Sequence, residues 1–341
     1  MGHYIYEDEI SELLRNVHNI HKKDVYNYIG TDLETEFEEY FNFCLSNMRE
    51  ECDMFNIQPS FLYFFDEYDT KARATKFEGK YIIEIKYGVV KILHNLFVGS
   101  LFFGQDQIIE KYFGLIQIIT PKSIPQLMLQ YSTLFTYYHE LAHLIQKSDY
   151  TDNSLLEEIP NQQESEDKRK HILEVDADFF AASNLAQHIC QYWDEIKLSN
   201  SSVSNNQLYE LVVISMASIN CYLAYSFQTF PEEIYFYENS HPHAANRLLL
   251  ILGVINDYIK KHLEITIEDI KLMTLSTIDL AYDILQHKAE EGHQIKSWRD
   301  KVSLNMEKII EYGKEMTVEM GKTPTLASVR ILNLQSPNHN N

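Results

Sequence analysis

Apolar side chains recur at every third or fourth position through much of this chain, which is the spacing of a helix that buries one face. Near the N-terminus the spacing predicts helices over residues 5–21 and 32–52. Near the C-terminus it predicts helices over residues 265–290 and 297–319. The pattern therefore predicts a mainly helical protein.

Two short segments instead have the character of β-strands. Ser60–Phe65 is aromatic and follows Pro59, while Lys80–Lys86 follows Gly79 and carries apolar side chains at every second position. We expect these strands to form a small antiparallel sheet. The expected fold is therefore α+β, mainly α, with additional helices around the sheet.

The apolar run over residues 134–145 contains an H-E-x-x-H pattern, formed by His139, Glu140 and His143. Residues four apart on a helix lie nearly above one another, so both imidazoles face one side and can bind a single zinc ion. Glu140 lies roughly 100° around the helix, where its carboxylate can take a proton from an attacking water. Two histidines that merely face the core are the alternative.

A further predicted helix, over residues 172–185, supplies the other half of such a site. Glu174 and Asp178 lie four residues apart and therefore on one face. Glu174 is the candidate third zinc ligand, and Asp178 is the candidate to orient His139 through its other ring nitrogen. An acidic face in contact with solvent is the alternative. We favour zinc, because two helices each present half of one site.

The H-E-x-x-H segment that begins at His139 and the E-x-x-A-D segment that begins at Glu174 together resemble the gluzincin metallopeptidases. They are most similar to the HtpX-like and CAAX-prenyl-protease-like enzymes, and they also suit soluble peptidases of the ImmA/IrrE and Lit types. The resemblance implies a zincin-like catalytic domain in which a strand edge beside the metal pairs with the substrate backbone. Lys80–Lys86 is the candidate for that strand, and an interior structural strand is the alternative.

A third element supports the resemblance. His241, Pro242 and Arg247 match the family's His-Pro followed by Arg, with the same six-residue offset. The resemblance implies that His241 stabilises the oxyanion, and we expect Arg247 to pair with an acidic residue of the site. Pro242 suits the first position of a helix, which places His241 at its start; a histidine that only caps the helix is the alternative. Three further residues are alternates for the oxyanion role: His243, Tyr235 and Tyr237.

We expect the chain to be organised in consecutive segments. Residues 1–59 are an N-terminal helical segment, and residues 60–255 are the zincin-like metallopeptidase domain. Residues 256–331 are a C-terminal helical segment, followed by a disordered tail over residues 332–341. Within the central domain, the polar residues 147–170 are expected to form a surface loop.

The composition limits the partners and the compartment. The formal net charge is −21 and no Lys/Arg-rich run occurs, so the chain should repel phosphate backbones and is not expected to bind nucleic acid. The four cysteines show no C-x-x-C spacing, which favours buried reduced thiols in a cytoplasmic protein over disulfides or a cysteine zinc site.

Residues 211–230 carry no charge and are long enough to cross a membrane. However, Asn220, Gln228 and several hydroxyl side chains make the segment polar for lipid, and its flanks are acidic. We therefore expect a buried helix near the site and no membrane insertion. In this respect the chain departs from the membrane-embedded members of the family that it resembles.

These features predict a cytoplasmic endopeptidase that uses Zn²⁺ to hydrolyse peptide bonds of a protein or peptide substrate. One alternative is another zinc amidohydrolase, such as a deformylase-like enzyme, although the cysteine ligand of that family is absent here. A second alternative is a zinc-containing regulatory or sensor protein without catalytic activity. No particular oligomeric state is predicted.

Overall fold

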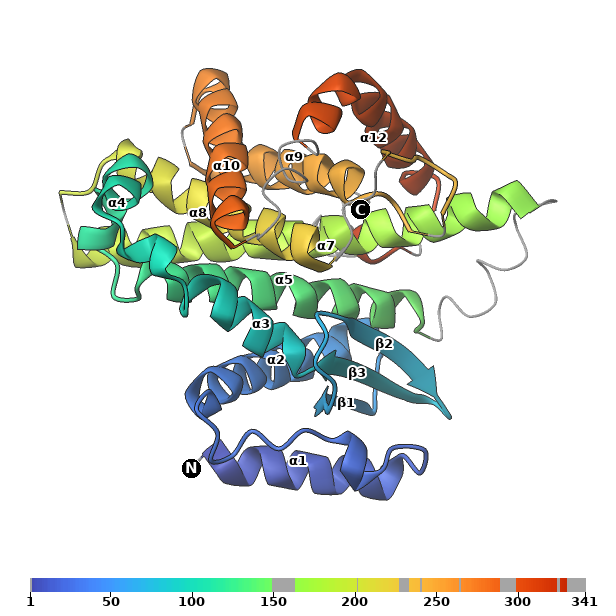
Figure 1. The fold of residues 1–341 in the computed structure, drawn as a ribbon. Coiled ribbons are helices and arrows are strands. Elements are labelled where there is room, and N and C mark those ends of the chain that lie inside the picture. The colour runs from blue at the N-terminus through green and yellow to red at the C-terminus, as the bar shows by residue number, and fades with distance from the viewer. Residues whose placement is uncertain are drawn as a thin grey trace, which may run out of the picture. The chain divides into compact units, whose positions relative to one another are not determined.

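The structure is a computed structural model that describes residues 2–148, 163–200, 202–226, 233–239, 241–263, 265–288, 299–323 and 326–329. The described residues are mainly helical, with one three-stranded sheet (Figure 1). The predicted α+β, mainly α class is confirmed. The tail over residues 332–341 lies outside the described residues.

The helices are interrupted once, by the strands of the sheet. Two α-helices precede the strands, with a short 3-10 helix between them: α1 (Gly2–Asn16), η1 (Lys22–Asp24) and α2 (Glu34–Phe55). The strands are β1 (Ser60–Phe65), β2 (Ala72–Phe77) and β3 (Lys80–Lys86). The helices that follow are α3 (Gly88–Phe97), η2 (Leu101–Gly104), α4 (Asp106–Tyr112), η3 (Ile116–Ile118), α5 (Ile124–Gln146), α7 (Gln163–Ser199), α8 (Asn205–Ser226), α9 (Ala244–His262), α10 (Ile267–Lys288) and α12 (Met306–Met320).

Most predicted helices are present, with two corrections. The helix predicted over residues 297–319 is interrupted by a turn at Asn305, after which α12 begins. The surface loop predicted over residues 147–170 is too long, because α7 already begins at Gln163. The sequence of the first turns of α7 is polar, so it lacks the regular apolar spacing from which a helix is predicted. Charge pairs such as Lys170–Asp167 support the helix there instead.

The chain forms two compact units. Unit 1 combines residues 1–92, 136–180 and 316–341, and unit 2 combines residues 93–135 and 181–315. The helices α5, α7 and α12 each continue from one unit into the other. The expected division into consecutive segments 1–59, 60–255 and 256–331 stays a prediction.

The sheet of unit 1 is mixed, so the predicted antiparallel sheet is wrong. The strand order is β1-β3-β2; β1 pairs with β3 in parallel and β2 pairs with β3 antiparallel. A two-residue turn, Glu78-Gly79, joins β2 to β3, and both residues have positive φ (49° and 73°), as in the tight turns that fit strand twist. Lys80–Lys86 is therefore the central strand, and the prediction that its edge pairs with a substrate is also wrong.

Both faces of the sheet are covered within unit 1. On one face, Phe61 and Tyr63 of β1 pack with Leu13 of α1 and with Val17, the residue after it. Figure 1 shows α1 lying beside the sheet. On the other face, Phe64 meets Phe37 of α2 edge-on, with ring centroids 5.0 Å apart. This double burial explains why β1 is a nearly continuous apolar run, and why successive residues of β3 are buried, Glu84 included.

In unit 2, α8 is buried along most of its length. Among the described residues it is the one helix long and apolar enough to cross a membrane by length and composition, yet 78% of its most apolar stretch is buried inside the structure. Ser215 donates to the carbonyl of Leu211, and Ser132 of α5 donates to the carbonyl of Ser218. The expected buried helix is thus present up to Ser226, and residues 227–230 lie outside the described part.

The four cysteines are free and buried, as expected. Burial raises the pKa of each thiol, to about 11 for Cys190. Because the thiolate is the reactive form, these thiols are structural.

Candidate metal centre

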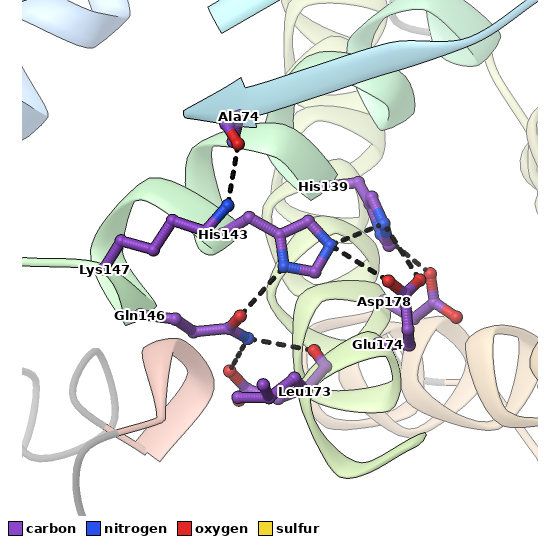
Figure 2. A network of polar contacts seen from close by, with 9 residues as sticks. Ala74, His139, His143, Gln146, Lys147, Leu173, Glu174 and Asp178 are labelled. Carbon is purple, nitrogen blue, oxygen red and sulfur yellow. Dashed lines mark hydrogen bonds and ion pairs between the residues drawn. The ribbon is translucent and has the colours of Figure 1, made fainter. Parts of the chain in front are cut away.

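The predicted metal ligands meet between two helices of unit 1. His139 and His143 lie one turn apart on α5, and Glu174 faces them from α7 (Figure 2). The Nε2 atoms of the two imidazoles are 3.1 Å apart, and each lies 3.5 Å from a different carboxylate oxygen of Glu174. The three side chains are 12–16% exposed. The site is thus recessed, and the solvated acidic face is excluded for Glu174.

Asp178, also on α7, lies behind His139. Its Oδ1 atom is 3.0 Å from Nδ1 of His139, and its side chain is fully buried. A carboxylate beside Nδ1 favours a proton on that nitrogen, so the lone pair of Nε2 is left facing Glu174. The structure therefore brings Asp178 to the place that the sequence predicted.

His143 is held by a different group, Gln146, one turn further along α5. The Oε1 atom of Gln146 lies 2.9 Å from Nδ1 of His143. The amide nitrogen of Gln146 donates to the carbonyl of Leu173, at 2.9 Å (Figure 2). It also donates to Oδ2 of Asp176, at 2.7 Å. Nε2 of His143, like that of His139, is thus turned toward the centre.

The two nitrogen–oxygen distances fit a tetrahedral metal ion better than they fit hydrogen bonds, whereas the 3.1 Å between the imidazole nitrogens is within hydrogen-bond range. A nitrogen 3.5 Å from an oxygen is beyond the usual hydrogen-bond range of 2.7–3.2 Å. A tetrahedral zinc ion with bonds of about 2.0–2.2 Å places neighbouring ligand atoms about 3.3–3.6 Å apart. In addition, two imidazole lone pairs and one carboxylate point toward the same place. These electron-rich groups repel one another unless a positive charge lies between them. The three residues could therefore hold a metal ion.

The charge state of Glu174 agrees with this role. Burial alone would raise its pKa, but the two imidazoles that face it hold the pKa well below its usual range. Glu174 is therefore an anion at neutral pH. A bound metal ion would place positive charge against this carboxylate.

Glu140 is buried on α5 next to the first histidine. Its carboxylate accepts no hydrogen bond from the residues that the structure describes. Both Glu140 and Glu174 lie close enough to Lys147 to act on its charge, although burial is the larger effect and lowers the pKa of Lys147. Lys147 donates to the carbonyl of Ala74 at 2.7 Å, which ties the C-terminal end of α5 to strand β2 (Figure 2).

His241 and Arg247 belong to unit 2, so the centre described above is built without them. Helix α9 begins at Ala244, not at Pro242 as predicted, and its cap is His243, whose Nδ1 accepts from the backbone of Ala245 at 3.0 Å. His241 is exposed and lies two residues before this cap, while Arg247 is buried in the first turn. The roles predicted for both residues stay predictions.

The three alternates for the oxyanion role also belong to unit 2. His243 is fully buried, and burial lowers its pKa to about 4, so it is neutral at physiological pH. The ring of Tyr235 packs edge-on against it, with centroids 4.9 Å apart. Tyr237 donates to Glu315. The oxyanion role of these three residues stays a prediction.

Sequence reasoning missed three residues of the centre: Gln146, Asp176 and Lys147. Gln146 follows His143 by three residues, a spacing that places the two side chains together on a helix. That spacing is a weak signal, because many glutamines stand three residues from a histidine. Asp176 gave no signal, since its role depends on residues far along the chain.

Comparisons of the chain with protein-family models, with curated proteins and with solved structures found no match. The resemblance to gluzincins therefore stays a prediction. The functional argument rests on the geometry of the centre.

Proposed function

We propose that the protein is a zinc-dependent endopeptidase whose metal ligands are His139, His143 and Glu174. The observation that carries this proposal is the convergence of three electron-pair donors whose nearest ligand atoms lie 3.1–3.5 Å apart, with the carboxylate of Glu140 beside the two histidines on α5. A bound zinc ion supplies Lewis acidity, which lowers the pKa of a water and polarises a carbonyl.

Glu140 is proposed to act as the general base. A carboxylate without a hydrogen-bond partner among the described residues is available to take a proton from the attacking water and to return it to the leaving amine. Asp178 and Gln146 keep the two imidazoles oriented with Nε2 toward the metal. His241 remains the proposed donor to the oxyanion, and Arg247 is the residue that we predict to pair with an acidic residue of the site.

The edge that pairs with a peptide is proposed to be β2 rather than Lys80–Lys86. β2 is an edge strand of the sheet, and the carbonyl of Ala74 points away from β3 toward α5, where it meets Lys147. Outward backbone groups on an edge strand can pair with an extended chain. A peptide bound there would run beside the helix that carries Glu140.

A regulatory or sensor protein with structural zinc is the second candidate. Structural zinc sites are usually closed by four protein ligands, whereas catalytic sites keep one position open. The described residues offer three ligands at this centre. The open position favours catalysis, by a peptidase or by another zinc amidohydrolase.

The test compares the wild-type protein with Glu140→Gln in cells, by mass spectrometry of newly formed protein termini. We expect termini that appear only with the wild type, and a loss of cleavage rate of about 10²- to 10⁴-fold for Glu140→Gln. Elemental analysis should find one zinc per chain in both proteins, because Glu140 is not a ligand, and none in His143→Ala.

The matched control is Glu7→Gln, the same chemical change at an exposed position of α1. It should retain both zinc and cleavage. Zinc retained without any new termini would favour the sensor, and undiminished zinc in His143→Ala would exclude the proposed centre.

A further inference from the structure

A chain of buried hydrogen bonds leads from His143 away from the centre. It passes through Gln146 to Asp176 on α7, and from Asp176 to Ala327 and Ser328 near the C-terminal end. All of these residues belong to unit 1. Gln146 and Asp176 are buried, so the loss of any of their hydrogen bonds would leave a buried polar group unpaired and would destabilise the folded state.

The direction of the amide of Gln146 is fixed by its neighbours. The carbonyl of Leu173 can only accept a hydrogen bond, so the group that faces it must be the NH₂ of Gln146. The oxygen of Gln146 therefore faces His143, and Nδ1 of His143 must carry the proton that it donates. This leaves the lone pair of His143 on Nε2, the atom that faces Glu174 and His139.

The position of Asp176 is fixed in turn by the C-terminal segment, residues 326–329. Its Oδ2 atom accepts from the backbone of Ala327, at 2.8 Å, as well as from Gln146. Its Oδ1 atom accepts from the backbone of Ser328, at 3.0 Å, and from the hydroxyl of Ser328. Asp176 lies two residues from Glu174, so on α7 it points to the side of the helix away from the metal.

We propose that Gln146, held by Asp176 and by residues 326–329, is a positioning residue that selects the metal-binding tautomer of His143. The inference rests on the proposed metal centre but not on peptidase activity. It makes a segment about 150 residues beyond Asp176 part of the metal centre.

The test uses Gln146→Met in the full chain, because methionine is unbranched and of similar length but has no amide. Long-range ¹H–¹⁵N NMR spectra of the zinc-free protein report which imidazole nitrogen carries the proton, and His143→Gln assigns the signals of His143. We expect His143 to be protonated on Nδ1 in the wild type and to lose that preference in Gln146→Met.

Zinc affinity is measured on the same proteins by competition with a chromophoric chelator. We expect Gln146→Met to weaken zinc binding by about 10- to 100-fold. The control, Gln130→Met, makes the same change on α5 at a position far from the centre, and should keep the wild-type affinity. Ser328→Ala removes only one donor to Asp176, so it should fold and weaken zinc binding by about 2- to 10-fold.

An unchanged tautomer or an unchanged zinc affinity in Gln146→Met would overturn the proposal. If that variant does not fold, wild-type affinity in Ser328→Ala would overturn it. A wild-type protein that binds no zinc would overturn the proposed function, while the tautomer of His143 would still show whether Gln146 positions it.

Discussion

At the residue scale, the properties of the centre depend on what lies behind each ligand. His139 is backed by the buried carboxylate of Asp178, and His143 by the amide of Gln146. A carboxylate behind an imidazole makes that imidazole a stronger electron donor than an amide does. The two histidines are therefore expected to differ in how strongly they bind the metal, although they stand one turn apart on the same helix.

This difference gives a prediction for Asp178→Asn. The neutral amide no longer favours the proton on Nδ1 of His139, so zinc affinity should fall by about 10- to 100-fold without emptying the site at saturating zinc. A competition titration measures the change. The matched control is Asp257→Asn, at an exposed position of α9. Equal zinc affinities of Asp178→Asn and the wild type would show that Asp178 does not orient His139.

At the element scale, the connection from the sheet to α3 depends on a close approach of two backbone segments. Gly88 begins α3, and its amide donates to the carbonyl of Glu67 at 3.2 Å. A Cβ atom at this position would lie 2.2 Å from the backbone nitrogen of Asp69. Only glycine fits there without a shift of the backbone, since backbone atoms cannot rotate aside as a side chain can.

We therefore predict that Gly88→Ala lowers the free energy of unfolding by about 1–3 kcal/mol or more, as overpacked sites do. Gly253→Ala is the matched control, because Gly253 lies inside α9 with open space around the added methyl group. That change should raise stability by about 0.5–1 kcal/mol through helix propensity. Denaturant unfolding of the zinc-free proteins measures both, and equal effects of the two substitutions would contradict the argument.

At the scale of the whole molecule, the chain carries a large negative charge and an apolar helix that lies inside a unit. The formal net charge of −21 favours solubility and opposes binding to anionic surfaces. The apolar stretch of α8 is mostly covered by its own unit, including α10 and α9. The hydroxyls of Ser215 and Ser218 already donate hydrogen bonds within the protein. Transfer of α8 into lipid would therefore give the helix no additional stabilisation.

We accordingly predict that the protein is recovered in the supernatant when cells are fractionated without detergent. Moving α8 into lipid would expose the apolar protein surfaces that now cover it to water, at a free-energy cost that grows with the exposed apolar area. Immunoblots of supernatant and pellet measure the distribution. Recovery only in the pellet, released by detergent but not by high salt, would instead place the protein in the membrane.

The sequence by itself determined the two halves of the centre. The facing of His139 and His143 follows from their spacing on a helix, and so does that of Glu174 and Asp178. These are local properties, set by 3.6 residues per turn. The strands β1 and β3 could also be predicted from the sequence, because they are rich in apolar side chains, which are buried on both faces of the sheet. The helical class followed from the same periodicity.

Only the tertiary structure decided the strand order, the edge beside α5 and the partners of Asp176. β2 is polar and mostly part-exposed, so it carries no strong strand pattern, and its pairing with β3 makes β3 central. Ala327 and Ser328 reach Asp176 across more than 150 residues. Such contacts depend on how distant segments pack, and the free energy of that packing is not encoded in the spacing of neighbouring residues.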